Sequence, residues 1–470
     1  MGCRDRGVRD QRALEPVTPS SADSFEGSAD PFPREDLTER IAQAERQELR
    51  RQAWQAWILG VGLALIALAI PMERLWGEMN LVRTAAEGGR GLGLGVPLLR
   101  FASRWMSHEQ AAFAMAAISA GLTVPALRSL LLTIGFSNAI AMRGVGLVVL
   151  APLHLLGATS AVLLAPGILG ATLIARELFR LNKDQSMRAL WRVSSVFFLG
   201  LLLDPANLLL LPAAGLALIP LATPRKLPPW APPAGLTLTI GFCVFILLGA
   251  GEPDALDQLL RAMLAGGKGP SLAGLGAWLI WLPISLGVGW LGILSLIAGN
   301  RTAEETPPPA WTRAWCLVAI APVIGGTPLT MPALGLLLPL TAVGLVDHLA
   351  RMEREDRMRR RANLLLISQL MLGVLAWGAL TATDPLTPWR EEAQETLDHE
   401  DLVFSAHPGH LYLINHRYGI ASWDLRAPGA SKRALEATNH GQRIVLDGVL
   451  PDASPQLKAA ATVVIGQPDG

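Results

Sequence analysis

Long apolar runs without a charged side chain recur along the sequence from Trp54 to Ala382. The first reads WILGVGLALIALAI. Crossing the ~30 Å hydrocarbon core of a bilayer takes about 20 residues of helix, and open sheet edges are not tolerated in lipid. The pattern therefore predicts an all-α polytopic membrane protein with about eleven spans. The expected spans are approximately residues 54–71, 111–135, 141–157, 159–175, 193–204, 206–223, 234–250, 273–299, 312–325, 328–347 and 363–381.

The segment before the first span has a different composition. Residues 1–36 mix Ser, Asp, Pro and Arg without apolar periodicity, which is typical of disorder. From Asp36 to Gln55 helix formers are interleaved with acids and arginines after a cap-like Asp, which predicts a helix that runs into the first span. We expect a disordered cytoplasmic tail over 1–36, followed by a transmembrane helical domain over 37–382.

Arginine and lysine in short loops orient the spans, because cytoplasmic loops carry an excess of these residues. The loop after Val346 is the most basic and is placed in the cytoplasm. Three further basic segments share that side only if 193–223 and 314–346 are hairpins, which puts the N-terminus inside and the C-terminus outside. These segments are 176–192, 224–233 and 301–313.

The tail changes character after residue 382. The runs DLVFSA, RIVLDGV and ATVVIG resemble strands, and PWREEAQETLDHE looks helical. We expect a small extracytoplasmic α/β domain over 383–470. The HPGH stretch of His407 and His410 crosses a Pro-Gly turn, which does not place both imidazoles on one helical face, so we interpret these histidines as surface residues.

Composition agrees with a membrane protein. Half of the 470 residues are hydrophobic (51%) and 17% are charged, compared with roughly 25% charged in soluble domains. Three scattered cysteines are too few for a disulfide framework, and we interpret them as free thiols.

The segment 72–110, between the first two spans, concentrates charge on the outer side. One interpretation is that its Arg and Glu side chains reach the interface from juxtamembrane helices. The other is a carboxylate beside a lipid-borne phosphate, with arginines binding the departing phosphate. The sequence GGRGLGLG lacks the strand–turn–helix setting of a dinucleotide loop. The charged residues are Glu73, Arg74, Glu78, Arg83, Glu87, Arg90, Arg100, Arg104, His108 and Glu109.

The topology and two short stretches of this segment resemble the GT-C superfamily of membrane glycosyltransferases, particularly bacterial protein O-mannosyltransferase-like proteins. Gly77-Glu78 stands where that family has Gly-Asp, and GVPLLRFASRW (95–105) resembles the end of its second motif, without the His-Pro-Pro. The resemblance implies transfer of a sugar from a polyprenyl-phosphate donor to an acceptor on the outer face. It implies that Glu78 is the catalytic base and that Arg83, Arg100 and Arg104 bind the donor phosphate. Glu73, Arg74 and His108, which belong to the same charged segment, are secondary candidates.

Two other functions stay open. A transporter or flippase of a lipid-linked solute would use ionisable groups within the spans, for which Arg128, His154 and Asp204 are the candidates. Asp204-Pro205 also has the pattern of a helix start. The departures from the family motif leave a non-catalytic GT-C-like relative as the third function.

The expected partners are a polyprenyl-phosphate-sugar lipid and the bilayer, with no nucleic acid. No cofactor is expected, and a divalent metal requirement stays open, as do the sugar, the acceptor and the oligomeric state. We expect the chain in a bacterial inner membrane.

Overall fold

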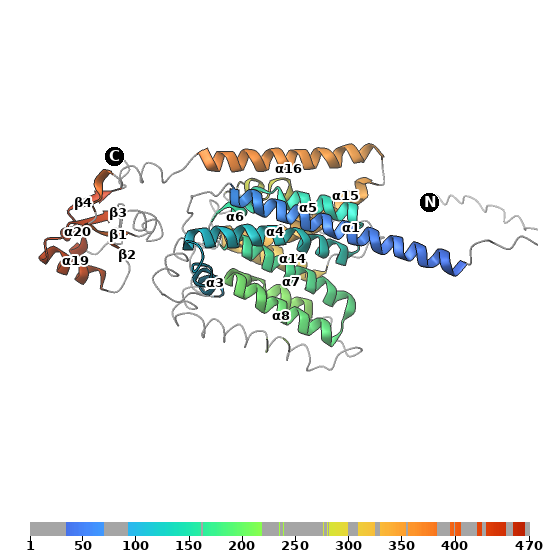
Figure 1. The fold of residues 1–470 in the computed structure, drawn as a ribbon, viewed down its shortest axis with the longest axis horizontal. Helices are drawn as coiled ribbons and strands as arrows, with labels where there is room; N and C mark the ends of the chain where they lie inside the picture. Colours follow the sequence, from blue (N-terminus) through green and yellow to red (C-terminus); the bar gives the residue numbers. More distant parts are fainter. Residues whose placement is uncertain are drawn as a thin grey trace, which may run out of the picture. The chain divides into compact units, whose positions relative to one another are not determined.

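The structure is a computed structural model of the chain (Figure 1). It describes residues 34–69, 93–160, 163–218, 282–298, 309–324, 330–353, 356–382, 395–398, 400–405, 421–424, 429–447 and 455–465, with a few single positions between 235 and 280. The chain divides between Arg51 and Gln52 into two units.

Most described residues before 383 are helical. Their ends often have recognisable signals: Ser107 and Gln110 form a capping box at the start of α4, and Gly135, with a φ of 116°, ends it. The helices are α1 (Arg34–Ala69), α3 (Gly95–Ala102), α4 (His108–Ile134), α5 (Asn138–Val149), α6 (Pro152–Thr159), α7 (Leu164–Asp184), α8 (Met187–Leu203), η1 (Pro205–Leu210), α9 (Leu211–Leu218), η3 (Gly287–Gly289), α13 (Trp290–Ala298), α14 (Ala310–Ile324), α15 (Thr330–Glu353) and α16 (Asp356–Ala382).

Among the described residues, two stretches are long and apolar enough to cross a membrane: Arg50–Ala69 and Gln110–Ile134. The pair α5 and α6 makes a third if it is a single broken span. Shorter apolar helices occupy parts of other expected spans, at 205–218, 282–298, 332–346 and 363–376. The expected span 234–250 lies almost wholly outside the described residues.

The span expected at 141–157 is not one straight helix. Its two halves, α5 and α6, meet at an angle of 66°. Pro152 is the first residue of α6, and proline has no backbone N–H with which to continue the preceding helix. The chain therefore bends before His154, and the expected crossing is divided into two short helices.

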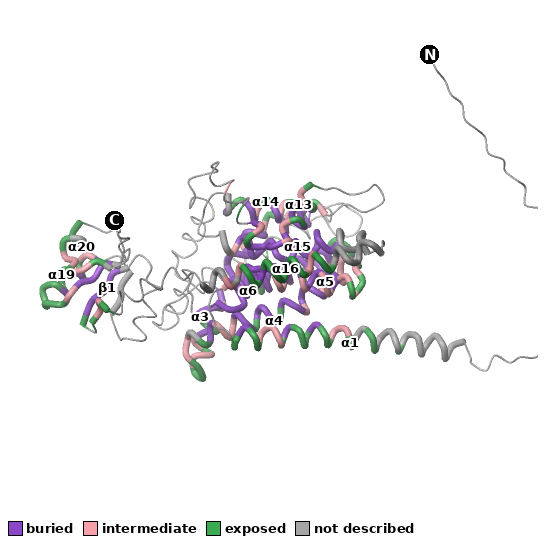
Figure 2. The backbone as a smooth tube through the Cα atoms, turned by 90° about the horizontal axis from the view of Figure 1, so that it is seen from above, coloured by how far each residue is buried: buried purple, intermediate pink, exposed green. Residues whose placement is uncertain are grey.

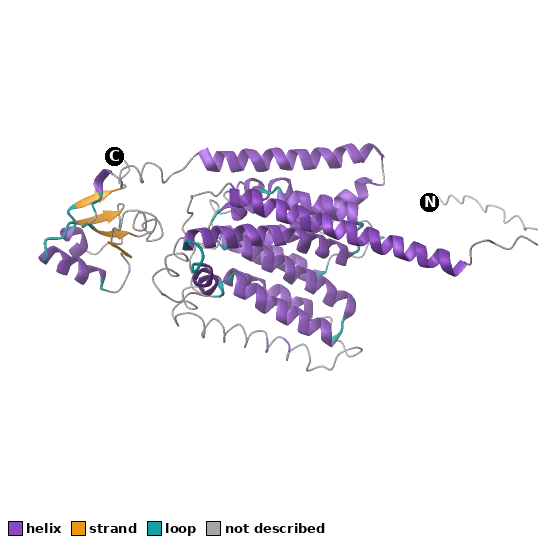
Figure 3. Cartoon of the chain, in the orientation of Figure 1, coloured by secondary structure: helices purple, strands orange, loops and turns teal. Residues whose placement is uncertain are grey.

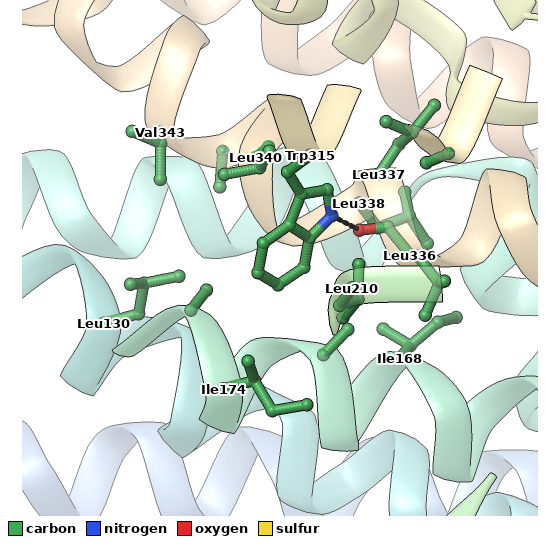
Figure 4. Close-up of a cluster of buried hydrophobic side chains, with 14 of the residues drawn as sticks. Leu130, Ile168, Ile174, Leu210, Trp315, Leu336, Leu337, Leu338, Leu340 and Val343 are labelled. Atoms are coloured by element: carbon green, nitrogen blue, oxygen red, sulfur yellow. Dashed lines mark hydrogen bonds between the residues drawn. The ribbon is translucent and has the colours of Figure 1, made fainter. Parts of the chain in front are cut away.

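Helix α15 is central to the helical core. Every residue from 333 to 346 is buried, as the purple tube of Figure 2 indicates. Beside it, the fully buried Trp315 of α14 donates a hydrogen bond from Nε1 to the Leu336 carbonyl at 2.9 Å, among the leucines and isoleucines of Figure 4. This bond satisfies the indole N–H away from water, where an unpaired donor would cost about 1–3 kcal/mol.

Helix α16 is attached to the core by Gln369. Its side chain is fully buried, and its Nε2 donates to the Leu147 carbonyl of α5 at 2.9 Å and to the Leu286 carbonyl at 3.1 Å. Its Oε1 accepts from the Val288 N–H of η3 at 2.6 Å. One side chain therefore connects three segments that lie far apart in the sequence.

Two ends of the helical core can be distinguished. Helix α4 follows α3 and ends at Ile134, where the Lys183 ammonium of α7 donates to the Ile134 carbonyl at 3.3 Å and to the Thr133 carbonyl. Its 27 residues correspond to about 40 Å of helix. We name the two ends of α4 the α3 end and the Lys183 end.

Beyond residue 400, four short strands form a parallel sheet in the order β2-β1-β3-β4 (orange in Figure 3). Helices α19 (Ala430–Asn439) and α20 (Pro455–Ala460) contribute Ala434 and Leu457 to a core with Phe404. Three strands lie in the runs expected from the sequence, and β2, with the sequence ASWD, was not expected. The strands are β1 (Leu402–Ser405), β2 (Ala421–Asp424), β3 (Ile444–Asp447) and β4 (Val463–Ile465).

Candidate functional site

The acidic residue favoured as a base, Glu78, lies outside the described residues. The same holds for Glu73, Arg74 and Arg83, because the described chain resumes at Gly93. We keep the name outer segment for residues 72–110, after the side on which the sequence predicts them. The described part of the predicted site consists of the end of this segment and the helices that it contacts.

The outer segment returns to the helical core at the end of α8. The Leu94 N–H donates to the Leu202 carbonyl at 2.8 Å. Gly93 precedes it with a φ of +75°, and a Cβ at this position would lie only 2.6 Å from the Leu202 carbonyl oxygen. Glycine is therefore required twice over, by the backbone conformation and by the close approach. The outer segment is thereby fixed two residues before Asp204.

Asp204 is a buried carboxylate at this point, with 6% of its surface exposed. It is extended, with a φ of −153°, and its Oδ1 accepts from the Ala206 N–H at 2.9 Å, which caps η1. Pro205 follows as the first residue of η1. The helix-start interpretation of Asp-Pro is therefore confirmed, and Asp204 also belongs to the α3 end.

Glycines of α7 make room for this carboxylate. A Cβ on Gly167 would overlap the Asp204 Oδ2 atom, and a Cβ on Gly170 would lie 2.9 Å from the Asn207 Nδ2 atom. Any larger residue at 167 would displace the carboxylate, because atoms in a packed interior have little freedom to shift.

Asn207 lies beside Asp204 and was not among the site candidates named from the sequence. It is fully buried, and its Nδ2 donates to the Gly200 carbonyl at 3.0 Å and to the Asp204 carbonyl at 3.2 Å. Its Oδ1 has no hydrogen-bond partner in the described part of the protein. A carboxylate and an amide oxygen, from Asp204 and Asn207, thus lie against the glycines of α7 at the α3 end. We call this contact the glycine seam. In the sequence, only the polar stretch DPAN indicates it.

Helix α3 has an apolar surface directed away from the core. It buries Val96 and Leu99, whereas Phe101 and Trp105 are 56% and 69% exposed. The Arg104 guanidinium lies 5.7 Å from the Phe101 ring centroid. Exposed aromatics beside an arginine are typical of a helix in the membrane interface.

The other cations predicted for the site lie on or just after this helix. Arg100 is in the last turn of α3 and is half-buried. His108 is the first residue of α4 and is also half-buried. Arg100, Arg104, His108 and Asp204 are therefore all found at the α3 end.

Arg128 and His154 do not join this group. Arg128 is buried in the C-terminal part of α4, where its Nε donates to Asn138 Oδ1 at 2.7 Å, so it lies toward the Lys183 end. His154 is fully buried in α6, and neither ring nitrogen has a hydrogen-bond partner among the described residues. The three candidates for a carrier site are thus dispersed, since Arg128 and Asp204 lie toward opposite ends of the core.

An apolar groove opens between α1, α6 and α16. Its volume is about 190 Å³. Thr159, the one hydroxyl in its lining, donates to the Leu155 carbonyl at 2.9 Å and so adds no unsatisfied polar group. The lining of α1 belongs to its last two turns, from which the chain enters the outer segment. The lining residues are Leu63, Ile66, Ala67, Leu155, Ala158, Thr159 and Val374.

The described residues contain no group of three or more His, Cys, Asp or Glu side chains that could hold a metal ion. Cys316 is a buried free thiol, and Cys3 and Cys243 lie outside the described residues, as do His407 and His410.

No protein-family profile and no curated protein matches the chain. Among solved structures it is similar to ArnT from Cupriavidus metallidurans, which was crystallised bound to undecaprenyl phosphate. The likeness covers 83% of this chain and 89% of that one, with 14% identity and a TM-score of 0.49.

Proposed function

We propose that the chain is a membrane glycosyltransferase of GT-C type, which moves a sugar from a polyprenyl-phosphate donor to an acceptor at the α3 end. One observation carries the proposal. The outer segment docks by the Leu94–Leu202 hydrogen bond beside a buried carboxylate, Asp204, at the same end as Arg100 of α3 and Arg104 just after it. An acid and arginines at a membrane interface suit a lipid-borne phosphate.

The proposed reaction needs a base and a binding site for phosphate. Glu78 takes the proton from an acceptor hydroxyl, whose oxygen bonds to the anomeric carbon of the sugar. The bond between that carbon and the phosphate oxygen breaks, and the phosphate leaves on its lipid. Arg83, Arg100 and Arg104 bind the phosphate oxygens as negative charge develops on them. A guanidinium suits this role because it can donate two parallel hydrogen bonds to one phosphate.

Asp204 is proposed as the second carboxylate of the site. It is held by its cap and by the glycine seam, so its charge has a fixed position close to where the outer segment docks. We assign it the role of orienting the arginines of that segment toward the donor phosphate. A fixed charge is more effective than a mobile one because it needs no reorganisation during the reaction.

The apolar groove is proposed to hold the first part of the polyprenyl chain. Val374 lines it and is 52% exposed, so a larger side chain there fills the groove without overpacking the core. In Val374→Trp we expect a several-fold higher half-saturating donor concentration and an unchanged maximal rate, measured as transfer against donor concentration. Leu375→Trp is the matched control, because Leu375 is 63% exposed and does not line the groove. Equal donor curves for both variants would remove the groove from the proposal.

The placement of the chain follows from the same proposal. Residues 1–36 are a cytoplasmic tail, 37–382 form the membrane domain, and 383–470 form an extracytoplasmic domain of a bacterial inner-membrane protein. A transporter or flippase would have the same location in the membrane. Only an assay that follows the labelled sugar distinguishes it from a glycosyltransferase.

Purified protein in vesicles, supplied with a panel of labelled polyprenyl-phosphate sugars, tests this function. We expect label to leave the lipid fraction with at least one donor and to appear on a soluble or membrane acceptor. Label that changes leaflet while staying on its lipid identifies a flippase. Label that does neither, across the panel, indicates a non-catalytic relative.

A further inference from the structure

The Lys183 end contains a second group of arginines, which the proposed reaction does not use. Its centre is Glu177 of α7, which is 2% exposed. The Glu177 Oε1 accepts from Arg176 Nε at 2.8 Å and from Arg180 Nη1 at 2.9 Å. From α8, Arg192 Nε lies 4.0 Å from Glu177 Oε2. Three guanidinium groups from two helices thus surround one carboxylate.

Positive charge exceeds negative charge around this centre. The second acid, Asp184, accepts from Arg192 Nη2 at 3.2 Å. Lys183 in the last turn of α7 and Arg188 in the first turn of α8 add two further exposed cations. We name these residues the Glu177 cluster: Arg176, Arg180, Lys183, Arg188 and Arg192 with Glu177 and Asp184.

The acids of the cluster position its arginines without using all of their N–H donors. A guanidinium has five N–H donors, and Arg180 and Arg192 each use one donor in a hydrogen bond to an acid of the cluster. Their side chains are 34% and 48% exposed, and that of Arg176 is 22% exposed. The buried carboxylate therefore holds the arginines together while further donors remain accessible to an anion outside.

The depth of the cluster matches a lipid headgroup. Trp191, next to Arg192 on α8, is 51% exposed, and exposed tryptophans lie at the boundary between hydrocarbon and headgroups. From Val193 to its end at Leu203, α8 has no charged residue, and only Ser194 and Ser195 are polar. Arg188 and Arg192 therefore lie at the level where phosphodiesters of the bilayer are found.

We propose that the Glu177 cluster is a binding site for the phosphodiester headgroup of an anionic phospholipid in the leaflet at the Lys183 end. The general excess of basic residues in cytoplasmic loops does not require arginines to converge from two helices on one buried acid. Convergence gives several guanidinium donors in fixed positions, which suits bidentate binding of phosphate, and basic sites between membrane helices bind such headgroups. The proposal is independent of the glycosyltransferase reaction.

The test measures the binding of phosphatidylglycerol to the full-length protein in phosphatidylcholine nanodiscs, from the lipid retained at increasing phosphatidylglycerol content. In the double variant Arg180→Gln/Arg192→Gln we expect binding weaker by about tenfold, the effect of losing about 1.4 kcal/mol of charge-assisted contact. Arg313→Gln is the matched control, because Arg313 is an exposed arginine of α14 outside the cluster, and we expect unchanged binding.

Two further measurements keep the test decisive. The unfolding midpoint of the double variant in pure phosphatidylcholine shows whether it folds, and if it does not, Arg188→Gln replaces it, with about threefold weaker binding expected. Wild-type binding by the variant that folds would overturn the proposal. Equal displacement of the lipid by millimolar glycerol phosphate would overturn it as well, because the site would then be one for free anions.

Discussion

Replacing Asp204 with Asn is expected to lower the rate of sugar transfer by about 10²-fold without unfolding the protein. Asparagine can accept the Ala206 N–H as Asp204 does, ranks with aspartate as an N-cap, and has nearly the same size within the seam of Gly167. The substitution therefore keeps the cap, removes the negative charge and replaces one acceptor oxygen by an amide NH2 donor. Loss of one preorganised electrostatic group at an active site lowers rates by about 10²–10³-fold. The measurement is transfer of labelled sugar in vesicles at equal protein level.

Two control variants separate charge from capping in this prediction. Asp204→Ala removes the cap as well and costs about 1 kcal/mol of additional stability. Ser186→Ala removes the cap at the other end of α8, where the Ser186 hydroxyl accepts from the Ala189 N–H at 3.2 Å, and should leave transfer unchanged. If Asp204→Asn transfers sugar at the wild-type rate, Asp204 is a helix cap and no part of the site.

Parts of the fold with local causes could be predicted from the sequence. The span expected at 111–135 corresponds to α4, because the Ser107–Gln110 capping box and Gly135 mark its ends in the sequence itself. The first span and the helix before it are both present in α1, since no proline separates the charged helix formers from the apolar run. Apolar length and capping are short-range properties, and both can be read residue by residue.

The extent of α7 could not be predicted in the same way. The expected span ended at residue 175, whereas the helix continues to Asp184 with Glu177 buried. The span was predicted from a run without charged side chains, and such a run ends before Arg176 and Glu177. The charge of Glu177 is offset by Arg176 and Arg180 on the same helix and by Arg192 on the next. Burial of a charge depends on partners that the local pattern does not reveal.

The sequence named several residues of the α3 end as candidates, but it did not show how they are held there. Asp204 and Arg100 were both named from the sequence. Only packing shows that Gly93 allows the chain before α3 to approach Leu202 and that Gly167 makes room for Asp204. Asn207 was missed as a site residue because a buried amide looks like an ordinary turn residue until its neighbours are known. The predicted base, Glu78, lies outside the described residues and stays a prediction.

Glu78→Gln is expected to have the largest effect on activity. Glutamine has the shape of glutamate but cannot take a proton from the acceptor hydroxyl, and a positioned general base contributes about 10²–10⁴-fold to a rate. Transfer should therefore fall by at least about 10²-fold, while protein level and donor binding are retained. Glu73→Gln is the matched control, because Glu73 follows the first span so closely that we assign it to the interface. Its transfer rate should stay within about twofold of wild type.

The most direct measurement is the initial rate of labelled-sugar transfer by Glu78→Gln in vesicles, normalised to protein level and compared with Glu73→Gln and wild type. A rate reduced by about 10²-fold or more in Glu78→Gln alone is the predicted result. A Glu78→Gln rate equal to that of wild type would contradict the assignment of the catalytic base, and with it the proposed reaction at the α3 end.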